Sequence, residues 1–299
     1  MPDARSPREV PDRISDRISD RIRSWSRSTF VVAAGFAILV GFVLGCSGGD
    51  GAAAAEGVRS LHPVVVKEYA HDTGAFTQGL LWHKGKLYEG TGSGPGNRGI
   101  SSLRRVDLAT GKVEKIVQLD KRYFGEGLAL VGNRLIQLTW QNQIAFVYDV
   151  ETFERVGQFQ YRGPGWGLTY DGTHLIMSDG SEQLVFRDPK TFEEKRRIRV
   201  KREGRIIRKL NELEWVEGKI LANIWQSNTI VEIDPKDGRV TATIDASKVG
   251  PSRTKTRRVL NGIAYDPATK KLWLTGKNWP KLYEVRLETK SATTAPGKK

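Results

Sequence analysis

The chain has 299 residues, a formal net charge of +14 and a single cysteine. One cysteine cannot form an intramolecular disulfide, so a disulfide-stapled fold is excluded and stability must come from the burial of apolar side chains. Some 230 residues follow the N-terminal region, roughly the length that builds one large core.

An apolar run near the N-terminus predicts an export signal. Residues 30–45 (FVVAAGFAILVGFVLG) are shorter than the ~20 residues that a spanning helix needs, but they suit the core of a signal peptide. The run ends in Val43-Leu44-Gly45-Cys46, which resembles the lipobox of bacterial lipoproteins, where the signal is cut before a cysteine that then carries lipid. We expect residues 1–45 to be a signal segment and Cys46 to be lipidated; the alternatives are an uncleaved anchor and a buried thiol that occurs there by chance.

The small, polar stretch that follows the cysteine predicts a flexible tether. Residues 46–60 begin CSGGDGAAAAEG, a composition that leaves the chain extended and mobile. We therefore expect a lipoprotein that is exported and anchored to a membrane, facing the periplasm or the cell exterior. Its folded domain would span residues 61–287, and residues 288–299 would form a polar tail.

The rest of the chain is a repeat. A unit of about 45 residues recurs, with copies that start at Phe76, Phe124, Gly165, Leu210 and Leu260. Each copy has the pattern of a strand, a tight turn rich in Gly, Asn, Asp or Lys, and a second strand, followed by a third strand and another turn. Four strands in each unit of this length are typical of a propeller blade.

The last copy of the repeat lacks a fourth strand. Its third strand is residues 281–287 (KLYEVRL), and the polar tail comes next. Residues 63–69 (PVVVKEY) precede the first copy and can supply the missing strand, which would leave no free sheet edge. No segment shows sustained helical periodicity. The sequence therefore predicts an all-β fold, a five-bladed β-propeller closed by an N-terminal strand.

The basic residues are densest between Lys195 and Lys209, a segment with nine lysines and arginines and a single acidic residue, Glu203. Such a cluster can indicate nucleic-acid binding, but an exported lipoprotein rarely meets nucleic acid. The segment EKRRIRVKRE fits better as an exposed strand whose charges prevent edge-to-edge pairing, with contact to an anionic membrane or cell-wall polymer as the alternative. We therefore expect no nucleic-acid partner.

Two positions of the repeat predict a site at the central channel. The innermost strands of a propeller line its channel, so equivalent positions in the copies form a ring. The position that varies most holds Gln78, Glu126, Trp166, Asn211 and Asn261. A second ring, at the end of the second strand, holds Gly92, Trp140, Gly180, Trp225 and Lys277. Glu126 is the one acid in these two rings.

Two interpretations of the rings stay open on this pattern. Polar residues at strand starts can simply bond neighbouring units, and glycines there allow close strand approach. However, the ring positions differ in chemistry, and Phe76, Phe124 and three tryptophans would wall an apolar pocket beside a few polar groups. A carboxylate in such a pocket has a raised pKa and can exchange protons near neutral pH.

Nine short motifs occur in order over most of residues 64–287: FTQGL, YEGTG, FGEGL, LTW, GWGL, SDG, LNELE, LNGIAYD and TGKNWPKLYEV. Together they resemble the plant and bacterial glutaminyl-peptide cyclotransferases, also called glutamine cyclotransferases. This resemblance implies a five-bladed propeller. It also implies a reaction that converts an N-terminal glutamine to pyroglutamate with loss of ammonia, and peptides or proteins with N-terminal glutamine as substrates.

The resemblance implies that Glu126 is the catalytic acid and base. It further implies a substrate site lined by Phe76, Gln78, Phe124, Trp140, Trp166, Asn211, Trp225 and Lys277. The chemistry fits, because one proton must move from the attacking α-amine to the departing nitrogen, and a single carboxylate can carry it. We therefore expect no metal and no cofactor.

The other titratable residues form no second motif. The four histidines are scattered without metal-ligand spacing, so a zinc site is not expected. Asp179 fits an ordinary Asp-Gly turn, with calcium binding or an ion pair with Lys277 as the alternatives. Glu212 and Glu214 would point away from Asn211 in a strand, and we interpret them as structural.

An alternative function of another class is a non-catalytic propeller lipoprotein that binds peptides or scaffolds an envelope complex. A binding module has no need of a lone acid at an aromatic pocket, so Glu126 favours the enzyme. We expect the chain to act as a monomer.

Overall fold

The computed structural model describes residues 57–94, 99–251 and 258–289. The chain divides into Met1–Ala53 and Ala54–Lys299, and the described residues all belong to the second unit. The predicted signal segment, Cys46, most of the tether and residues 290–299 lie outside the described residues. The described part contains no α-helix, and so none that is long and apolar enough to cross a membrane.

Three consecutive segments each form a four-stranded antiparallel sheet, with the strands paired in chain order. The first sheet contains β2 (Thr77–His83), β3 (Lys86–Thr91), β4 (Ser102–Val106) and β5 (Val113–Gln118). The second contains β6 (Gly125–Val131), β7 (Arg134–Thr139), β8 (Ile144–Asp149) and β9 (Arg155–Gln160). The third contains β10 (Leu168–Tyr170), β11 (Leu175–Ser178), β12 (Gln183–Arg187) and β13 (Glu194–Arg199).

The remaining large sheet has eight strands in the order β16-β17-β18-β19-β1-β22-β21-β20. Its strands are β16 (Leu210–Val216), β17 (Lys219–Ile224), β18 (Thr229–Ile233), β19 (Val240–Asp245), β1 (Arg59–Ala70), β20 (Leu260–Asp266), β21 (Lys271–Gly276) and β22 (Lys281–Thr289). A separate hairpin joins β14 (Lys201–Arg202) to β15 (Arg205–Ile206). The eight-stranded sheet is two antiparallel groups of four, connected where β1 runs parallel to β19 over three residue pairs.

The N-terminal strand closes the last repeat, as predicted. β1 pairs antiparallel with β22, from Leu61 opposite Thr289 to Ala70 opposite Lys281. Both strands are longer than the sequence pattern indicates, because each extends the other's hydrogen-bonding ladder beyond the apolar segments at residues 63–69 and 281–287. The pairing covers the edge that the last repeat would otherwise expose.

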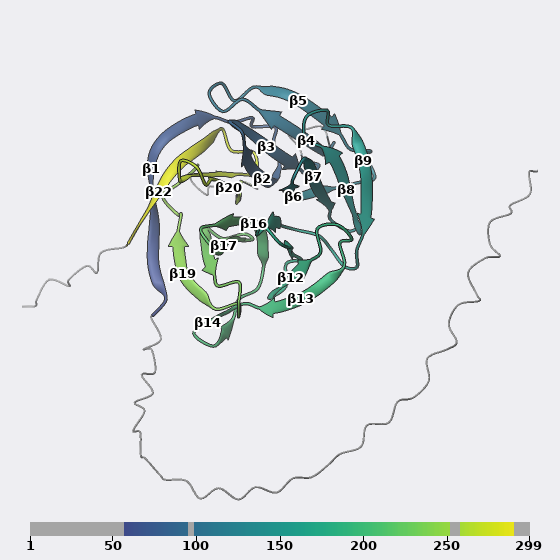
Figure 1. Ribbon diagram of the computed structural model, residues 1–299. Coiled ribbons are helices and arrows are strands. Elements are labelled where there is room, and N and C mark those ends of the chain that lie inside the picture. Colours follow the sequence, from purple (N-terminus) through teal and green to yellow (C-terminus); the bar gives the residue numbers. More distant parts are fainter. Residues whose placement is uncertain (1–56, 95–98, 252–257, 290–299) are drawn as a thin grey trace, which may run out of the picture. The chain divides into compact units, whose positions relative to one another are not determined.

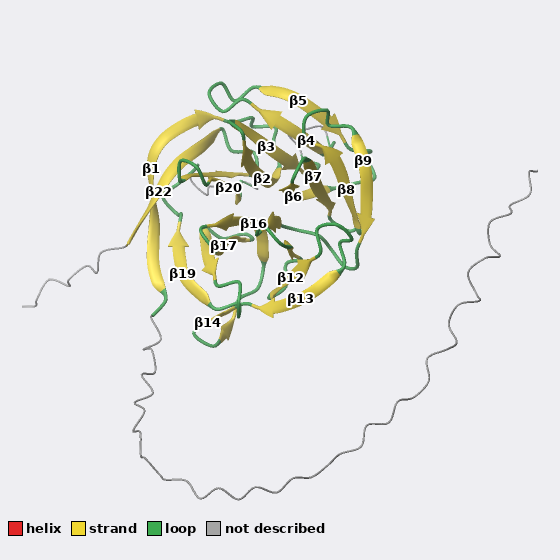
Figure 2. Ribbon diagram, viewed as in Figure 1, coloured by secondary structure: helices red, strands yellow, loops and turns green. Residues whose placement is uncertain are grey.

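The sheets are arranged around a common centre (Figure 1). β2, β6, β16 and β20 lie nearest that centre, and β5, β9, β13 and β1 lie at the rim. Burial follows this order, since the first five residues of β6 are buried whereas β9 is almost entirely exposed. Figure 2 shows that the connections between strands are loops and turns.

The core is divided into five clusters, and each combines side chains from two neighbouring groups of strands. One cluster packs Leu80 and Leu87 of the first sheet against Trp273 and Leu282 of the last group. The first and last repeats are therefore in contact, which makes the arrangement of sheets circular.

The innermost strands are irregular at the variable position of the repeat. The pairing register shifts between Thr77 and Gly79 in β2, and between Gly125 and Leu128 in β6. Shifts of the same kind occur in β16 and β20. A β-bulge turns a side chain away from the regular alternation of the strand. The bulges therefore lie where Gln78 and Glu126 leave the sheet pattern.

The first part of the basic segment forms the outer strand of the third sheet. The sequence predicted one exposed strand over residues 194–203, but β13 ends at Arg199, and Lys201 and Arg202 belong to the β14–β15 hairpin. In β13 only Ile198 is buried, and the charged side chains project outward. Several of them have nearby acidic partners, such as Arg199 with Glu182 at 3.9 Å and Lys195 with Asp188 at 3.6 Å.

Candidate active site

A cavity of about 250 Å³ lies at the N-terminal ends of the inner strands. Its lining consists of Phe76, Gln78, Phe124, Glu126, Trp140, Trp166, Asn211, Trp225 and Lys277. These are the nine residues that the sequence brought forward as the catalytic acid and its substrate site. Residues up to 201 positions apart, from Phe76 to Lys277, thus meet at one place because each repeat contributes the same part of its first or second strand.

Aromatic side chains form most of the cavity wall. The rings of Phe124 and Trp140 contact each other edge to face, with centroids 5.8 Å apart, and Phe76 meets Phe124 at 6.2 Å in the same manner. On the other side Trp166 and Trp225 are 5.4 Å apart. Aromatic pairs prefer such edge-to-face contacts. The wall is therefore apolar, and its rings pack against one another.

The glycines of the second predicted ring make room for this wall. A Cβ on Gly180 would lie 2.8 Å from the indole ring of Trp166, and a Cβ on Gly92 would overlap the ring of Phe124. Neither glycine lines the cavity. Two members of the predicted ring, Gly92 and Gly180, thus have no side chain because the aromatic rings occupy that space.

Glu126 lies inside the cavity with 4% of its surface exposed. The side-chain amide of Gln78 donates a hydrogen bond of 3.1 Å to its Oε1 atom. Burial raises the pKa of the Glu126 carboxyl group well above its ordinary value, although the positive charge of Lys277 acts in the opposite direction. A carboxyl group with a raised pKa keeps its proton to a higher pH than an ordinary glutamate does.

Lys277 faces the same space and is 5% exposed. Its Nζ atom lies 4.8 Å from the centre of the Phe76 ring, a cation–π arrangement. Burial lowers the pKa of the lysine amine to about 8, while Glu126 opposes that change. Each group thus moderates the cost of burying the other.

Asn261 does not line the cavity, although it occupies the variable position of the fifth copy. Its Nδ2 atom donates to Oε1 of Gln78 at 3.3 Å and to the backbone carbonyl of Thr77 at 2.9 Å. These bonds orient the Gln78 amide so that its NH₂ group faces Glu126. The sequence marked Asn261 as a channel residue but carried no sign of this supporting role.

The acidic residues near Asn211 have structural contacts, as the sequence interpretation held. Glu212 is buried and accepts the backbone N–H groups of Leu80 in β2 and Ile263 in β20, at 3.3 and 2.9 Å. Asp179 accepts the N–H group of Ser181 in a turn at 2.9 Å. No group of three or more His, Cys, Asp or Glu side chains in the described ranges is placed to hold a metal ion.

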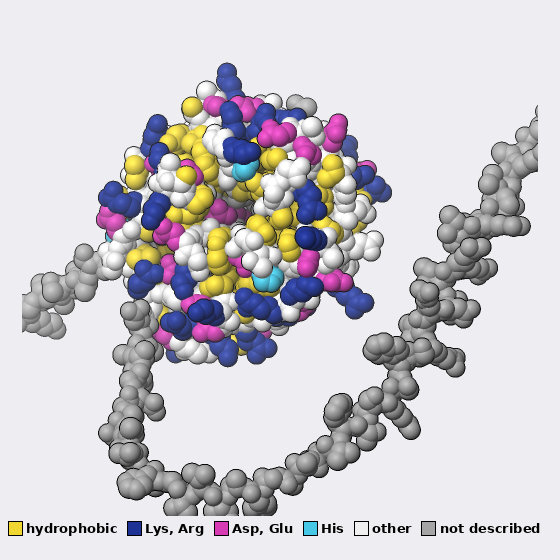
Figure 3. Space-filling view, viewed as in Figure 1, with side chains coloured by type: hydrophobic (Ala, Val, Ile, Leu, Met, Phe, Trp, Pro, Cys, Tyr) yellow, Lys and Arg dark blue, Asp and Glu magenta, His cyan; other side chains and the backbone are white. Residues whose placement is uncertain are grey.

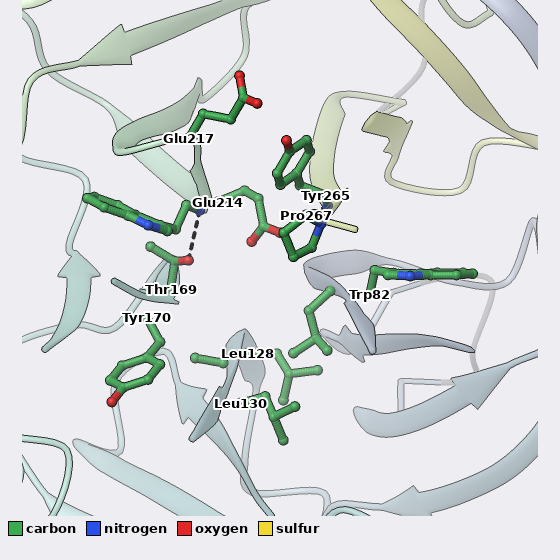
Figure 4. Close-up of a pocket in the computed structure, with 12 residues that line it drawn as sticks. Trp82, Leu128, Leu130, Thr169, Tyr170, Glu214, Glu217, Tyr265 and Pro267 are labelled. Carbon is green, nitrogen blue, oxygen red and sulfur yellow. Dashed lines mark hydrogen bonds between the residues drawn. The ribbon is translucent and has the colours of Figure 1, made fainter. Parts of the chain in front are cut away.

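A larger cavity of about 480 Å³ lies toward the C-terminal ends of the inner strands. Figure 4 shows the carboxylate of Glu214 directed into it near Pro267, and Thr169 bonded to the N–H group of Trp215. Burial raises the pKa of Glu214 to about 8. Figure 3 shows acidic side chains inside a central hollow ringed by hydrophobic ones. None of the nine residues named above lines this second cavity.

The chain is similar to known proteins over the whole described region. A family profile described as glutamine cyclotransferase matches residues 37–287. A glutaminyl-peptide cyclotransferase of Arabidopsis thaliana is 44% identical over 234 residues, which cover 76% of this chain and 72% of the relative. The crystal structure of Myxococcus xanthus glutaminyl cyclase superposes with a TM-score of 0.73 at 37% identity, over 78% of this chain and 100% of that one. The chain therefore belongs to the glutamine cyclotransferase family.

Proposed function

We propose that this protein converts the N-terminal glutamine of peptides and proteins to pyroglutamate and releases ammonia, with Glu126 as the acid and base. The observation that carries the proposal is the buried carboxyl group of Glu126, held by Gln78 and facing a lysine inside an aromatic cavity. Family membership supports the reaction class.

The reaction needs one proton to change places. The neutral α-amine of the substrate attacks its own γ-carboxamide carbon, which closes the five-membered lactam, and the carboxamide nitrogen leaves as ammonia. Glu126 gives a proton to the departing nitrogen and takes one from the attacking nitrogen, so the carboxyl group ends as it began. Proton transfer of this kind contributes about 10²–10⁴ in rate.

The remaining cavity residues have distinct roles in this proposal. The aromatic wall holds the glutamine side chain folded back on its amine, which removes the entropic cost of reaching that conformation in water. Lys277, Gln78 or Asn211 donates to the oxygen that becomes negative as the tetrahedral intermediate forms.

The activity is tested with the purified protein and a dipeptide that begins with glutamine. We expect stoichiometric release of ammonia and a product that is lighter by one ammonia. The alternative, a non-catalytic peptide-binding lipoprotein, would bind the dipeptide and release none.

We also propose that the fold is a five-bladed propeller. In this interpretation the eight-stranded sheet counts as two blades that touch through the short parallel pairing of β1 with β19. The five circularly arranged core clusters support it. The hairpin β14–β15 would be an insertion between the third and fourth blades.

The anchoring and the location of the protein are further parts of the proposal. The lipobox resemblance and the tether composition support an exported lipoprotein that is anchored through Cys46. Mass spectrometry of the protein purified from membranes would show a lipid-modified N-terminal cysteine. Cys46→Ser would then release the protein from the membrane fraction.

The charge of the substrate beyond its glutamine should affect turnover. Residues 201–209 carry exposed basic side chains, and Nζ of Lys209 lies 5.8 Å from the Trp225 ring at the cavity. Residues 248–258 add further basic residues, though 252–257 lie outside the described part. We expect Gln-Glu-Glu peptides to have a higher kcat/KM than Gln-Lys-Lys peptides, with a gap that narrows as salt rises from ~20 to ~500 mM. Equal values at low salt would show that these charges do not act on the substrate.

Activity should not depend on a metal ion. The proposed step uses only the carboxyl group of Glu126 and moves a single proton. We expect full activity after dialysis against phenanthroline, measured as ammonia release. Complete loss of activity that added zinc restores would place the protein in a different mechanistic class.

A further inference from the structure

A buried histidine lies behind the candidate active site and is not part of it. The side chain of His71 is only 7% exposed. Its Nδ1 atom lies 2.7 Å from the carbonyl oxygen of Trp279, and its Nε2 atom lies 3.1 Å from Oε1 of Glu89. A carbonyl oxygen only accepts hydrogen bonds, so Nδ1 must carry a proton.

The other ring nitrogen of His71 is protonated too. Oε1 of Glu89 also accepts the hydroxyl of Thr77 at 2.7 Å, and its neighbours hold the pKa of the Glu89 carboxyl group below its ordinary value. An ionised carboxylate accepts from both partners, so both ring nitrogens of His71 donate. The side chain is therefore an imidazolium.

The charges around this imidazolium are balanced. The imidazolium faces Glu89, which lies on β3, and Asp72 is its neighbour in the chain. On β4, Arg104 donates to Oδ2 of Asp72 at 2.7 Å and lies near Glu89. The turn at residues 277–280 contributes the carbonyl oxygen of Trp279, which lies against Nδ1 of His71. Two cations and two carboxylates thus form one network.

This network connects the two ends of the folded chain at the cavity. The backbone N–H group of His71 donates to Pro280 at 3.0 Å, and that of Asn278 donates to Ala75 at 2.7 Å. One side of the junction is the segment that places Phe76, and the other is the turn that places Lys277. The ammonium of Lys277 lies over the Phe76 ring across this junction.

We propose that His71 is a positioning residue: its imidazolium ties the turn at 277–280 to β3 and so holds the ammonium of Lys277 over Phe76 and toward Glu126. This role rests on the proposed function, in which Lys277 acts on the substrate. His71 itself does not line the cavity and takes no part in proton transfer.

The network makes the positioning dependent on pH. Its carboxylates raise the pKa of His71 above the ordinary 6.5, against the effect of burial. A raised pKa means that the stabilising contribution is fully present below pH 6.5 and is lost as the pH rises through the folded-state pKa. Above that pH the imidazolium becomes neutral and can no longer donate to both partners.

The test is a double-mutant cycle between residues that do not touch. His71→Gln should lower kcat/KM about 10-fold in the wild-type background and less than about 2-fold in a Lys277→Met background. Since glutamine does not titrate, the ratio of wild-type to variant activity should fall toward one at alkaline pH. The matched control is His174→Gln. His174 is half-buried and pairs with Asp171 at 3.5 Å, and its replacement should leave kcat/KM unchanged in both lysine backgrounds.

One assay condition and one second variant separate this role from simple support of the fold. All assays are run well below the thermal midpoint of each variant, and Glu89→Gln is the second variant if His71→Gln does not fold. Equal losses in both lysine backgrounds, or a ratio that does not change with pH, would show a structural role only.

The lysine itself gives a readout without activity. In protein labelled with ¹³C-lysine, the signal of Lys277 is the one that Lys277→Met removes. We expect it to titrate near pH 8 in the wild type. In His71→Gln its midpoint should lie about one pH unit or more higher, because the amine moves toward water. If the wild type releases no ammonia, the proposed function fails, and this titration alone decides the role of His71. An unchanged midpoint would refute it.

Discussion

Replacing Glu126 with glutamine is expected to lower kcat/KM by about 10²- to 10⁴-fold while the protein stays folded. The amide keeps the shape of the side chain and accepts the same bond from Gln78, but it cannot carry a proton between the two nitrogens. Two effects on stability oppose each other. The variant is stabilised because it no longer buries an acidic group, and it is destabilised because Lys277 loses its oppositely charged partner. We therefore expect a thermal midpoint within a few degrees of the wild type.

The control for this experiment is Glu217→Gln. Glu217 is exposed, pairs with Lys270 at 3.0 Å and does not line the cavity that holds Glu126. It should retain wild-type kcat/KM, measured by ammonia release. If Glu126→Gln kept more than about a third of wild-type activity, Glu126 would not be the group that moves the proton.

The largest effect on stability is expected from Gly167→Ala. A Cβ at this position would overlap the carbonyl oxygen of Asn211 and lie 2.9 Å from Cα of Glu212, so the third group of strands would be forced away from the fourth. Backbone atoms cannot yield as a flexible side chain does. Overpacking of this kind costs about 3 kcal/mol, which corresponds to a fall of about 6–12 °C in the thermal midpoint for a domain of this size.

Gly157→Ala is the matched control for the glycine substitution. Gly157 lies in the exposed outer strand β9, and a Cβ there would be 3.9 Å from the nearest heavy atom, on Val147. We expect an unchanged or slightly higher thermal midpoint, because alanine restricts the unfolded chain. Equal midpoints for the two variants in a thermal scan would mean that the inner strands adjust to a methyl group without cost.

The repeat made much of the cavity predictable. Because each copy begins with the same strand pair, Gln78, Glu126 and Asn211 occupy equivalent positions, and circular packing brings such positions together. The lone acid among them was therefore visible as an exception before any geometry was known. Its role as the proton carrier and those of its neighbours stay proposals that the substitutions above test.

Other parts of the site depend on contacts that no repeat pattern contains. Asn261 shares the variable position but does not line the cavity, and its amide instead donates to the Thr77 carbonyl and to Gln78. His71 contacts the backbone carbonyl of Trp279, 208 positions away. Every residue has such a carbonyl, so the sequence cannot indicate which one a side chain contacts. Neither arrangement follows from the spacing of residue types.

The sequence by itself thus determined the all-β class, the four-strand repeat, the pairing of the N-terminal strand with the last repeat, and which side chains share a ring. These properties follow from local alternation and from copies of one unit, so they can be read along the chain. Only the tertiary structure decided that two ring glycines make space for Phe124 and Trp166, that Glu126 and Lys277 are buried in one cavity, and that each ring nitrogen of His71 meets an oxygen atom. The physical reason is that burial and pKa depend on what other segments place around a group, and those segments meet only when the circle of sheets has closed.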